Sequence, residues 1–282
     1  MPTIYHYCDA TAFLSIVQNR ELWLANTRKM NDHSEGSVIA RAFVDSLRTH
    51  SPSVGTVDGF QQAVRVNQNE LFACCFSQDK DSTVQWMSYA DQGRGFAIGF
   101  DSDKLWTNKT NPYPIGAKNY YAPGSKTVDE TVALSEILYA EDQNILEVLK
   151  ILHGLLVQPD AYATANAAAA CRWFDAITKN RGFRHECEWR LIYGPLSPSS
   201  VMPASGHTPQ HENKNGMLWR PTKYGIAPYF KFPFDPSAVV EIWLGPRNPD
   251  HGDVSSRHLL ELLRNLSQFN DAPIHESASP YR

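Results

Sequence analysis

Residues 184–193 read Arg-His-Glu-Cys-Glu-Trp-Arg-Leu-Ile-Tyr, so two carboxylates lie at the start of an apolar run. Aromatic and β-branched residues favour a pleated, half-buried surface, and residues 189–193 are therefore predicted to form a strand. Alternation along an extended chain puts Glu186, Glu188 and Arg190 on one face. Burying such charges is costly unless they are paired or used. The segment thus predicts either a structural ion pair, in which Arg190 bridges both acids, or a functional carboxylate site.

Strands and helices are predicted in a mixed order around this segment. Apolar or aromatic runs indicate strands at residues 3–7, 22–25, 71–77, 95–100, 224–234 and 239–244. Helical spacing indicates helices after a cap at Asp9 or Thr11 and at residues 38–47, 81–90, 128–157, 161–180 and 254–266. Polar stretches at residues 31–36, 51–59 and 195–216 are predicted to be loops or turns. This order predicts an α+β fold in one domain over residues 1–282, with a helical segment at about 128–181.

The composition is that of a folded globular protein. The chain has 282 residues, 42% hydrophobic and 20% charged, with a net charge of −4 and no Lys/Arg block. Long-range attraction to nucleic acid or anionic lipid should therefore be weak, although a local cluster such as Arg181, Arg184 and Arg190 could still serve a nucleic-acid substrate. Five scattered cysteines without a C-x-x-C pair favour a reducing cytosol. No signal peptide and no apolar run near ~20 residues is visible, so we expect a cytoplasmic protein that does not use a membrane.

The sequence contains no complete motif of the common cofactor-binding or metal-binding types. Gly93, Gly95 and Gly99 resemble a glycine-rich nucleotide loop, but a strand follows where a helix should begin, so a turn and strand explain them better. His185-Glu186 begins like a zinc-protease helix, but Trp189 lies where the second histidine is required. The ten histidines lack metal-ligand spacing, and no metal is predicted.

Four polar clusters remain, and each also has an ordinary structural explanation. His6, beside Tyr7, could simply form a hydrogen bond within a sheet. Residues 31–35 resemble an Asx-turn and helix cap. Trp86 and Tyr89, which follow Ser77, lie three residues apart and could form one face of a core helix. The two-carboxylate segment is the fourth cluster.

Taken in this order, the clusters resemble the motifs of a widespread bacterial family described only as a domain of unknown function. The matching motifs are His6-Tyr7, Asn31-Asp32-x-x-Glu35, Phe76-Ser77, Trp86-x-x-Tyr89-Ala90, Gly93-x-Gly95-Phe96, Glu186-x-Glu188-Trp189-Arg190, Pro228-Tyr229, Ile242-x-Leu244-Gly245-Pro246-Arg247 and Ser277 to Arg282. They span nearly the whole chain.

The family in turn is similar to a distant branch of the ADP-ribosyltransferase fold, whose members bind NAD in a cleft between two β-sheets. The resemblance implies a split β-sheet core with helical insertions, with Glu188 as the catalytic acid, Glu186 on the acceptor side and Arg190 keeping both acids ionised. It implies that His6 is the first-strand contact to NAD and that Ser77, Trp86 or Tyr89 packs against nicotinamide. The full set of candidate NAD-binding residues is His6, Tyr7, Asn31, Asp32, Glu35, Ser77, Trp86 and Tyr89.

The first functional hypothesis is therefore an NAD-consuming ADP-ribosyltransferase, with NAD as substrate. Such an enzyme could be a toxin or phage-defence effector that modifies protein or nucleic acid and is matched by a neutralising partner. A second hypothesis is a ligand-binding or sensor module with the same fold and no transferase activity. A third is a metal-independent hydrolase of nucleotides or nucleic acid that uses Glu186 and Glu188.

Overall fold

The structure is a computed structural model that describes residues 2–29, 37–50, 54–66, 70–105, 117–121, 131–140, 142–157, 162–194, 217–222, 225–269 and 272–281. The described strands are β1 (Thr3–Cys8), β2 (Glu21–Asn26), β3 (Phe72–Ser77), β4 (Phe96–Asp101), β5 (Ala117–Tyr121), β6 (Thr131–Glu136), β7 (Leu138–Tyr139), β8 (Thr178–Lys179), β9 (Glu188–Gly194), β10 (Leu218–Thr222), β11 (Gly225–Pro233), β12 (Val239–Leu244) and β13 (Ile274–Glu276). The described helices are α1 (Ala10–Asn19), α2 (Val38–His50), α3 (Val54–Val66), α4 (Thr83–Tyr89), α5 (Asp142–Leu156), α6 (Ala163–Ala176) and α7 (Val254–Leu266), with short 3-10 helices η1 (Thr27–Lys29), η2 (Asp91–Gly93), η3 (Arg181–Glu186) and η5 (Pro236–Ala238).

The large sheet divides at β3. One edge of β3 pairs with β9 along its length, from Phe72 to Ser77. The opposite edge pairs with β2 at Phe72 and Ala73 but with β1 at Ser77. From there β1 leads to β4, β12 and β13, while β2 leads to β11 and β10. Between these two pairings, at residues 74–76, that edge of β3 has no partner strand among the described residues. The sheet therefore opens beside Cys75.

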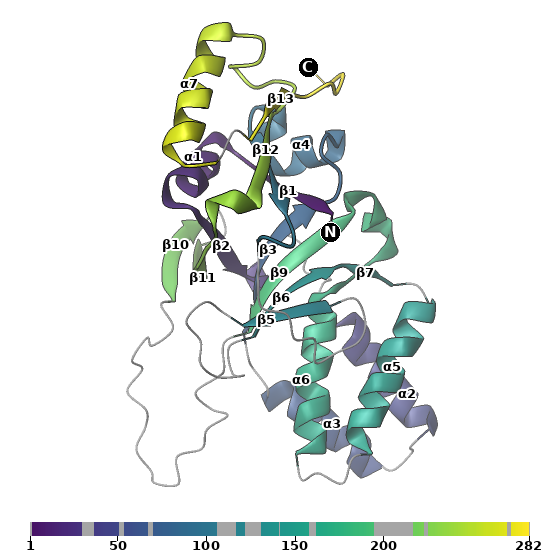
Figure 1. Cartoon of the computed structure of the whole chain (residues 1–282). Helices are drawn as coiled ribbons and strands as arrows, with labels where there is room; N and C mark the ends of the chain where they lie inside the picture. The colour runs from purple at the N-terminus through teal and green to yellow at the C-terminus, as the bar shows by residue number, and fades with distance from the viewer. Residues whose placement is uncertain are drawn as a thin grey trace, which may run out of the picture.

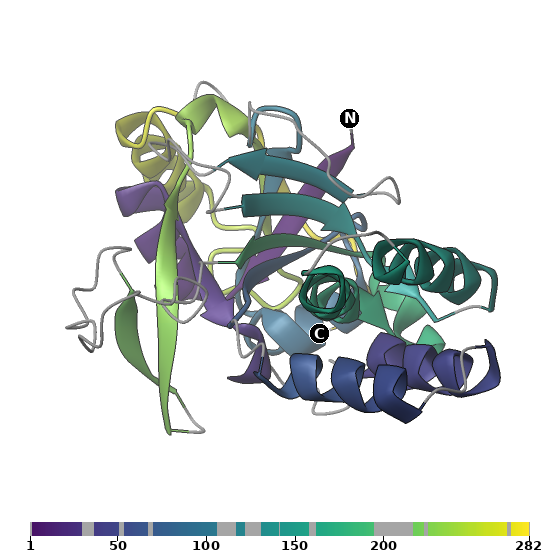
Figure 2. The ribbon, with the colours of Figure 1, turned by 90° about the horizontal axis from the view of Figure 1, so that it is seen from below.

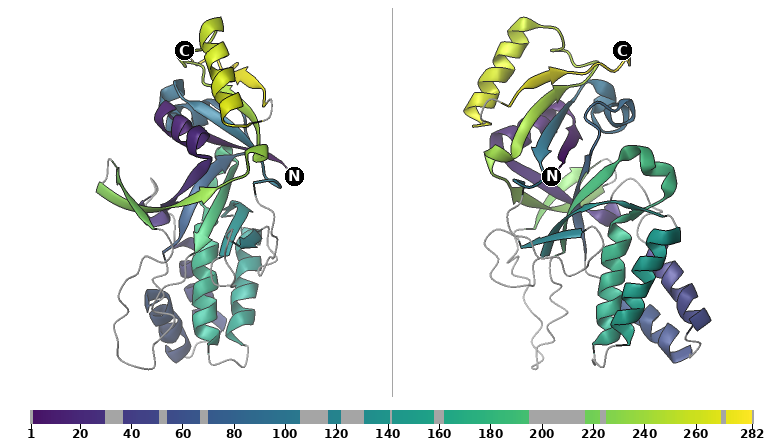
Figure 3. Two further views of the ribbon diagram at one scale, coloured as in Figure 1. Left: turned by 60° about the vertical axis from the view of Figure 1, so that its left-hand side comes forward. Right: turned by 45° about the vertical axis from the view of Figure 1, so that its right-hand side comes forward.

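Helices cover the two ends of the molecule differently. Helices α2, α3, α5 and α6 gather at one end, with α1 and α7 at the other (Figures 1 and 3), and α6 is seen nearly end-on in Figure 2. The four-helix end buries Phe43, Phe60 and Phe174 against the small side chains of Ala73 and Ala133. The opposite face of β3, β6 and β9 packs into the core that includes α1.

Helix α4 packs against β1 and is held in place by hydrogen bonds to Asp81. Trp86 of α4 is fully buried, and its ring packs edge-on against that of Tyr7 with ring centroids 4.7 Å apart. Its Nε1 donates a hydrogen bond to Asp81 Oδ1 at 2.7 Å. Asp81 also accepts hydrogen bonds from Ser277 Oγ and, at 2.9 Å, from the Ala278 backbone N–H. One carboxylate thus joins α4 to the segment that follows β13.

Most predicted elements are present, and the mixed order agrees with the α+β prediction. Asp9, rather than Thr11, caps α1, because its Oδ1 accepts from the Ala12 N–H at 2.7 Å. The helical prediction is wrong over residues 131–139, which form β6 and β7. Residues 132–134 are all buried, and a short apolar run without alternation does not distinguish a buried strand from a helix. Residues 54–59, predicted to be part of a turn, begin α3.

Some predictions lie beyond the described residues. The predicted loops at 31–36 and 195–216 are among them. In the described part of the chain, no helix combines the length and the apolar character that crossing a membrane would require.

Candidate functional site

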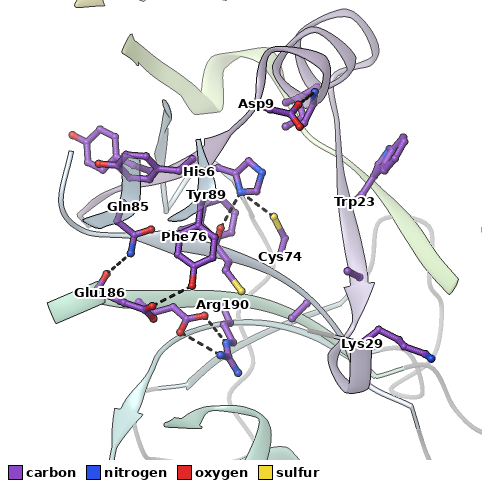
Figure 4. Close-up of a pocket in the computed structure, with 18 of the residues that line it drawn as sticks. His6, Asp9, Trp23, Lys29, Cys74, Phe76, Gln85, Tyr89, Glu186 and Arg190 are labelled. Atoms are coloured by element: carbon purple, nitrogen blue, oxygen red, sulfur yellow. Dashed lines mark hydrogen bonds and ion pairs between the residues drawn. The ribbon is translucent and has the colours of Figure 1, made fainter. Parts of the chain in front are cut away.

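A cavity of about 750 Å³ lies where the sheet opens beside β3. Its walls come from β1, α1, β2, β3, α4, β10 and the segment between Lys179 and Arg190 (Figure 4). The volume falls within the range of roughly 300–1,000 Å³ that is usual for small-molecule sites. The cavity has two ends. The inner end contains Glu186 and Glu188, and the outer end contains Trp23 and Lys29.

Lys179 joins the two carboxylates of the inner end. Its Nζ lies 2.6 Å from Glu186 Oε2 and 3.1 Å from Glu188 Oε2. All three residues are at most 6% exposed. The lysine follows α6 on the two-residue strand β8, which pairs in parallel with β7. In one of the two alternatives that the sequence left open, Arg190 bridges the acids; in the structure Lys179 makes the bridging contacts.

Arg190 holds Glu188 in a two-pronged ion pair. Its Nε lies 2.7 Å from Glu188 Oε1, its Nη2 lies 3.2 Å from Glu188 Oε2, and its Nη1 donates to the Ala176 carbonyl oxygen at 2.8 Å. Burial would raise the pKa of Glu188, but the charges of Arg190 and Lys179 outweigh it and lower that pKa. Glu188 is therefore ionised at neutral pH, and the two acids are balanced by two cations.

Glu186 reaches this end by a different backbone route from the one predicted. It ends η3, and Cys187 adopts a left-handed conformation with φ of 44°, so the strand begins only at Glu188. The prediction that Glu186 lies on the same extended strand is wrong, because the turn at Cys187 interrupts the alternation. The turn nevertheless brings both acids to Lys179.

Hydrogen bonds from β3 and α4 fix Glu186 in place. Its carbonyl oxygen accepts from Ser77 Oγ at 2.7 Å and from Gln85 Nε2 at 3.3 Å. Tyr89 donates its hydroxyl to Glu186 Oε1 at 3.1 Å (Figure 4). Ser77 is buried and does not line the cavity. Ser77 thus positions Glu186, while Gln85 and Tyr89 also form part of the wall.

His6 forms the wall next to the opening in β3. Its Nδ1 lies 2.9 Å from the Cys75 carbonyl oxygen, which can only accept, so Nδ1 carries the proton. Burial lowers the pKa of His6, although the bond to Cys75 opposes this shift. The ring is therefore neutral at pH 7, and Nε2 is its acceptor nitrogen.

The remaining predicted residues take other places. Trp86 is a core residue and does not line the cavity. Tyr7 borders it, but its hydroxyl donates to the Asp79 carbonyl oxygen at 2.7 Å and accepts from the Ser82 N–H at 3.2 Å. Asn31, Asp32 and Glu35 lie outside the described residues.

The outer end of the cavity was missed by sequence reasoning. Trp23 of β2 and Tyr229 of β11 lie with ring centroids 4.6 Å apart. The guanidinium of Arg220 on β10 lies 5.5 Å from the Trp23 ring and 5.9 Å from the Tyr229 ring. Alternation in β2, which buries Leu22 and Leu24, was the available signal that Trp23 faces the other way.

The groups that line the cavity favour carboxylate and imidazole chemistry over thiol chemistry. Burial raises the pKa of Cys74 to about 12 and that of Cys75 well above its usual value. Both thiols therefore stay protonated at neutral pH and are poor nucleophiles. Among the described residues, no three His, Cys, Asp or Glu side chains gather in a way that could hold a metal ion.

Residues 85–191 match a family described as "Protein of unknown function (DUF2971)". This confirms the expected likeness to an uncharacterised family over that segment. The matched segment contains Gln85, Tyr89, Lys179 and both acids, that is, the inner end of the cavity, whereas His6 and the outer end lie outside it. Comparisons with curated proteins and with solved structures gave no match.

Proposed function

We propose that the protein binds NAD in this cavity and cleaves the bond between nicotinamide and ribose, acting as an ADP-ribosyltransferase. The observation that supports this most directly is that His6 and Glu188, which are far apart in the sequence, line one cavity. The resemblance to the ADP-ribosyltransferase fold assigns these two residues to opposite sides of NAD. The divided sheet also supports the expectation of a cleft between two parts of a sheet.

The proposed reaction needs a fixed negative charge beside the ribose. The bond between ribose C1′ and the nicotinamide nitrogen breaks, and its electron pair leaves with the nicotinamide ring. C1′ becomes part of an oxocarbenium-like cation, which the ionised Glu188 stabilises. A hydroxyl or amine of the acceptor, or water, then adds to C1′ and loses its proton. Preorganised charge of this kind is commonly the largest catalytic contribution, on the order of 10²–10³ in rate for one group.

Glu186 and His6 would act on either side of that step. Glu186 has Lys179 and the Tyr89 hydroxyl as partners, and it is our candidate for taking the proton from the attacking group. The neutral His6 ring offers Nε2 to a ribose hydroxyl, because Nδ1 is held by Cys75. The acceptor class, protein or nucleic acid, and a role as a toxin or phage-defence effector rest on the family resemblance.

A second function is favoured by one observation. Both oxygens of Glu188 are engaged by cations, Oε1 by Arg190 and Oε2 by Arg190 and Lys179. A carboxylate neutralised in this way stabilises a developing cation less. This arrangement fits a module that binds NAD or a related nucleotide without turnover.

One experiment separates the two. The purified protein is incubated with NAD, nicotinamide release is measured, and binding is followed by thermal shift. Release that falls by about 10²–10³ in Glu188→Gln supports the enzyme. The matched control is Glu147→Gln, an exposed pair partner of Lys150 on α5, which should leave release unchanged.

The other outcomes decide the alternatives. Stabilisation by NAD without release would identify the binding module, since a ligand that binds only the folded state raises its stability. Undiminished release in Glu188→Gln, or neither binding nor release, would refute the enzyme hypothesis. Cleavage of nucleotides in the absence of NAD would favour a hydrolase.

A further inference from the structure

We propose that the outer end of the cavity is a subsite for the diphosphate of a nucleotide, with Arg220 as its main ligand and Trp23 as the stacking surface for the base. This inference rests on the proposed function, since it assigns the end of NAD opposite the nicotinamide to this subsite. It also extends to nucleoside diphosphates that have no nicotinamide.

Arg220 carries a buried donor that the described part of the chain leaves unsatisfied. Its Nε is buried and has no hydrogen-bond acceptor among the described residues. No described carboxylate forms an ion pair with it. A buried donor without an acceptor is costly, so such a group is usually satisfied by something outside the chain. A planar guanidinium matches the oxygens of a phosphate in a two-pronged geometry.

Two aromatic rings hold Arg220 in a fixed orientation. It lies over the rings of Trp23 and Tyr229, which themselves lie against each other. Such contacts between cations and aromatic rings restrict a side chain that would otherwise be flexible. The site is therefore built before any ligand arrives.

The charged side chains are unevenly distributed along the cavity. At the inner end, Glu186 and Glu188 are balanced by Lys179 and Arg190. At the outer end, Lys29 lies on the same side of the cavity as Trp23, away from Glu186 (Figure 4), and adds a second cation to Arg220. The remaining acid in the wall, Asp9, is occupied as the cap of α1. Counted with Asp9, the wall has four cationic and three acidic side chains, so the groups beyond the balanced inner end carry one net positive charge, which suits a diphosphate.

Trp23 lines the outer end of the cavity. Alternate residues of β2 are buried in the core, and Trp23 and Ala25 face the cavity between them. Nucleotide bases stack on aromatic side chains because every base presents a flat face. A base beside Trp23 would leave its 5′-phosphates near Arg220.

The test measures the binding of ADP and of adenosine by titration calorimetry to the full chain. Wild type should bind ADP at least ten times more tightly than adenosine, and ADP affinity should fall as salt is raised. Arg220→Gln should weaken ADP binding at least tenfold and leave adenosine binding within about twofold. Arg220→Lys, which keeps the charge without the fork, should lie between them and serves if Arg220→Gln fails to fold. Arg48→Gln, an exposed pair partner of Asp45 on α2, is the matched control.

The outcomes distinguish the subsite from the reaction. Equal affinity of wild type for ADP and adenosine, or unchanged ADP binding in both Arg220 variants, would overturn the subsite. ADP binding that depends on Arg220 in a protein that does not cleave NAD would keep the subsite and refute the proposed function. Cleavage of NAD with an unchanged KM in both Arg220 variants would keep the proposed function and refute the subsite.

Discussion

The Nδ1 of His6 lies 2.9 Å from the carbonyl oxygen of Cys75, at the stretch of β3 where the described residues provide no neighbouring strand on that edge. The imidazole thus takes the place that a backbone N–H has elsewhere in the sheet. Nδ1 therefore has the structural role, a hydrogen bond within the sheet. Nε2 of the same ring is the nitrogen that can face a ligand.

Two substitutions of His6 should separate these roles. In His6→Asn the side-chain amide can still reach the Cys75 carbonyl oxygen, whereas His6→Ala leaves that oxygen without its donor. We expect Ala to lower the free energy of unfolding by about 1–2 kcal/mol and Asn to lower it less. Both should weaken NAD binding, because neither retains Nε2. Urea denaturation and NAD titration measure the two effects, and wild-type affinity in His6→Asn would remove His6 from the binding site.

Lys179→Met should be strongly destabilising. It leaves two buried carboxylates without the cation that they share, and loss of one partner of a buried pair typically costs about 3–5 kcal/mol. Adding Glu186→Gln to this variant should restore part of the loss, since the buried charge that Lys179 no longer neutralises is then removed. Lys150→Met, at an exposed pair on α5, should change stability little. A small loss in Lys179→Met would mean that the carboxylates are hydrated rather than buried.

Asp175 should make the free energy of unfolding fall as the pH rises from about 4 to about 6. This buried acid accepts the Ile39 N–H at 2.8 Å at the start of α2, and burial raises its pKa to about 6. The pKa of this carboxyl is about 4 in the unfolded chain and about 6 in the folded protein, so the folded protein binds the proton more tightly. The stabilisation that protonated Asp175 contributes is therefore complete below pH 4 and lost once the pH exceeds 6. Asp175→Asn removes this dependence. Relative to Asp175→Asn, wild type should therefore lose on the order of 2–3 kcal/mol between pH 4 and 7 in urea denaturation. A difference that does not change with pH would contradict the raised pKa.

Asp81→Ala should loosen two segments at once. Its carboxylate accepts from Trp86 Nε1, Ser277 Oγ and the Ala278 N–H, so its removal leaves three donors without an acceptor. We expect faster proteolysis after β13 and weaker NAD binding, because Gln85 and Tyr89 lie on the same helix as Trp86. Asp45→Ala, an exposed acid paired with Arg48 on α2, is the control and should change neither. Cleavage at the wild-type rate in Asp81→Ala would show that other contacts hold the segment.

The sequence was sufficient for the elements whose burial pattern is simple. β1, β3, β4 and β12 follow from their apolar runs, and the Asp9 cap follows from residue type. β6 was misread because its apolar residues are buried on both faces and show no alternation. In the site, His6, both acids and Tyr89 were found from motifs. Lys179 could not be, since its role depends on where α6 ends and how β7 and β8 pair. Arg220 was missed because its position depends on the pairing of β10 with β11.

The hydrogen bonds of Asp81 also constrain the order in which the protein can mature during synthesis. Asp81 and Trp86 leave the ribosome early, but their partners Ser277 and Ala278 are made almost two hundred residues later. Until then, the carboxylate that anchors α4 lacks two of its three donors and accepts from Trp86 Nε1. Strands β10 to β13 are also made late, so both branches of the divided sheet and the Asp81 contacts are completed near the end of synthesis, and ligand binding should be among the last properties that the chain gains.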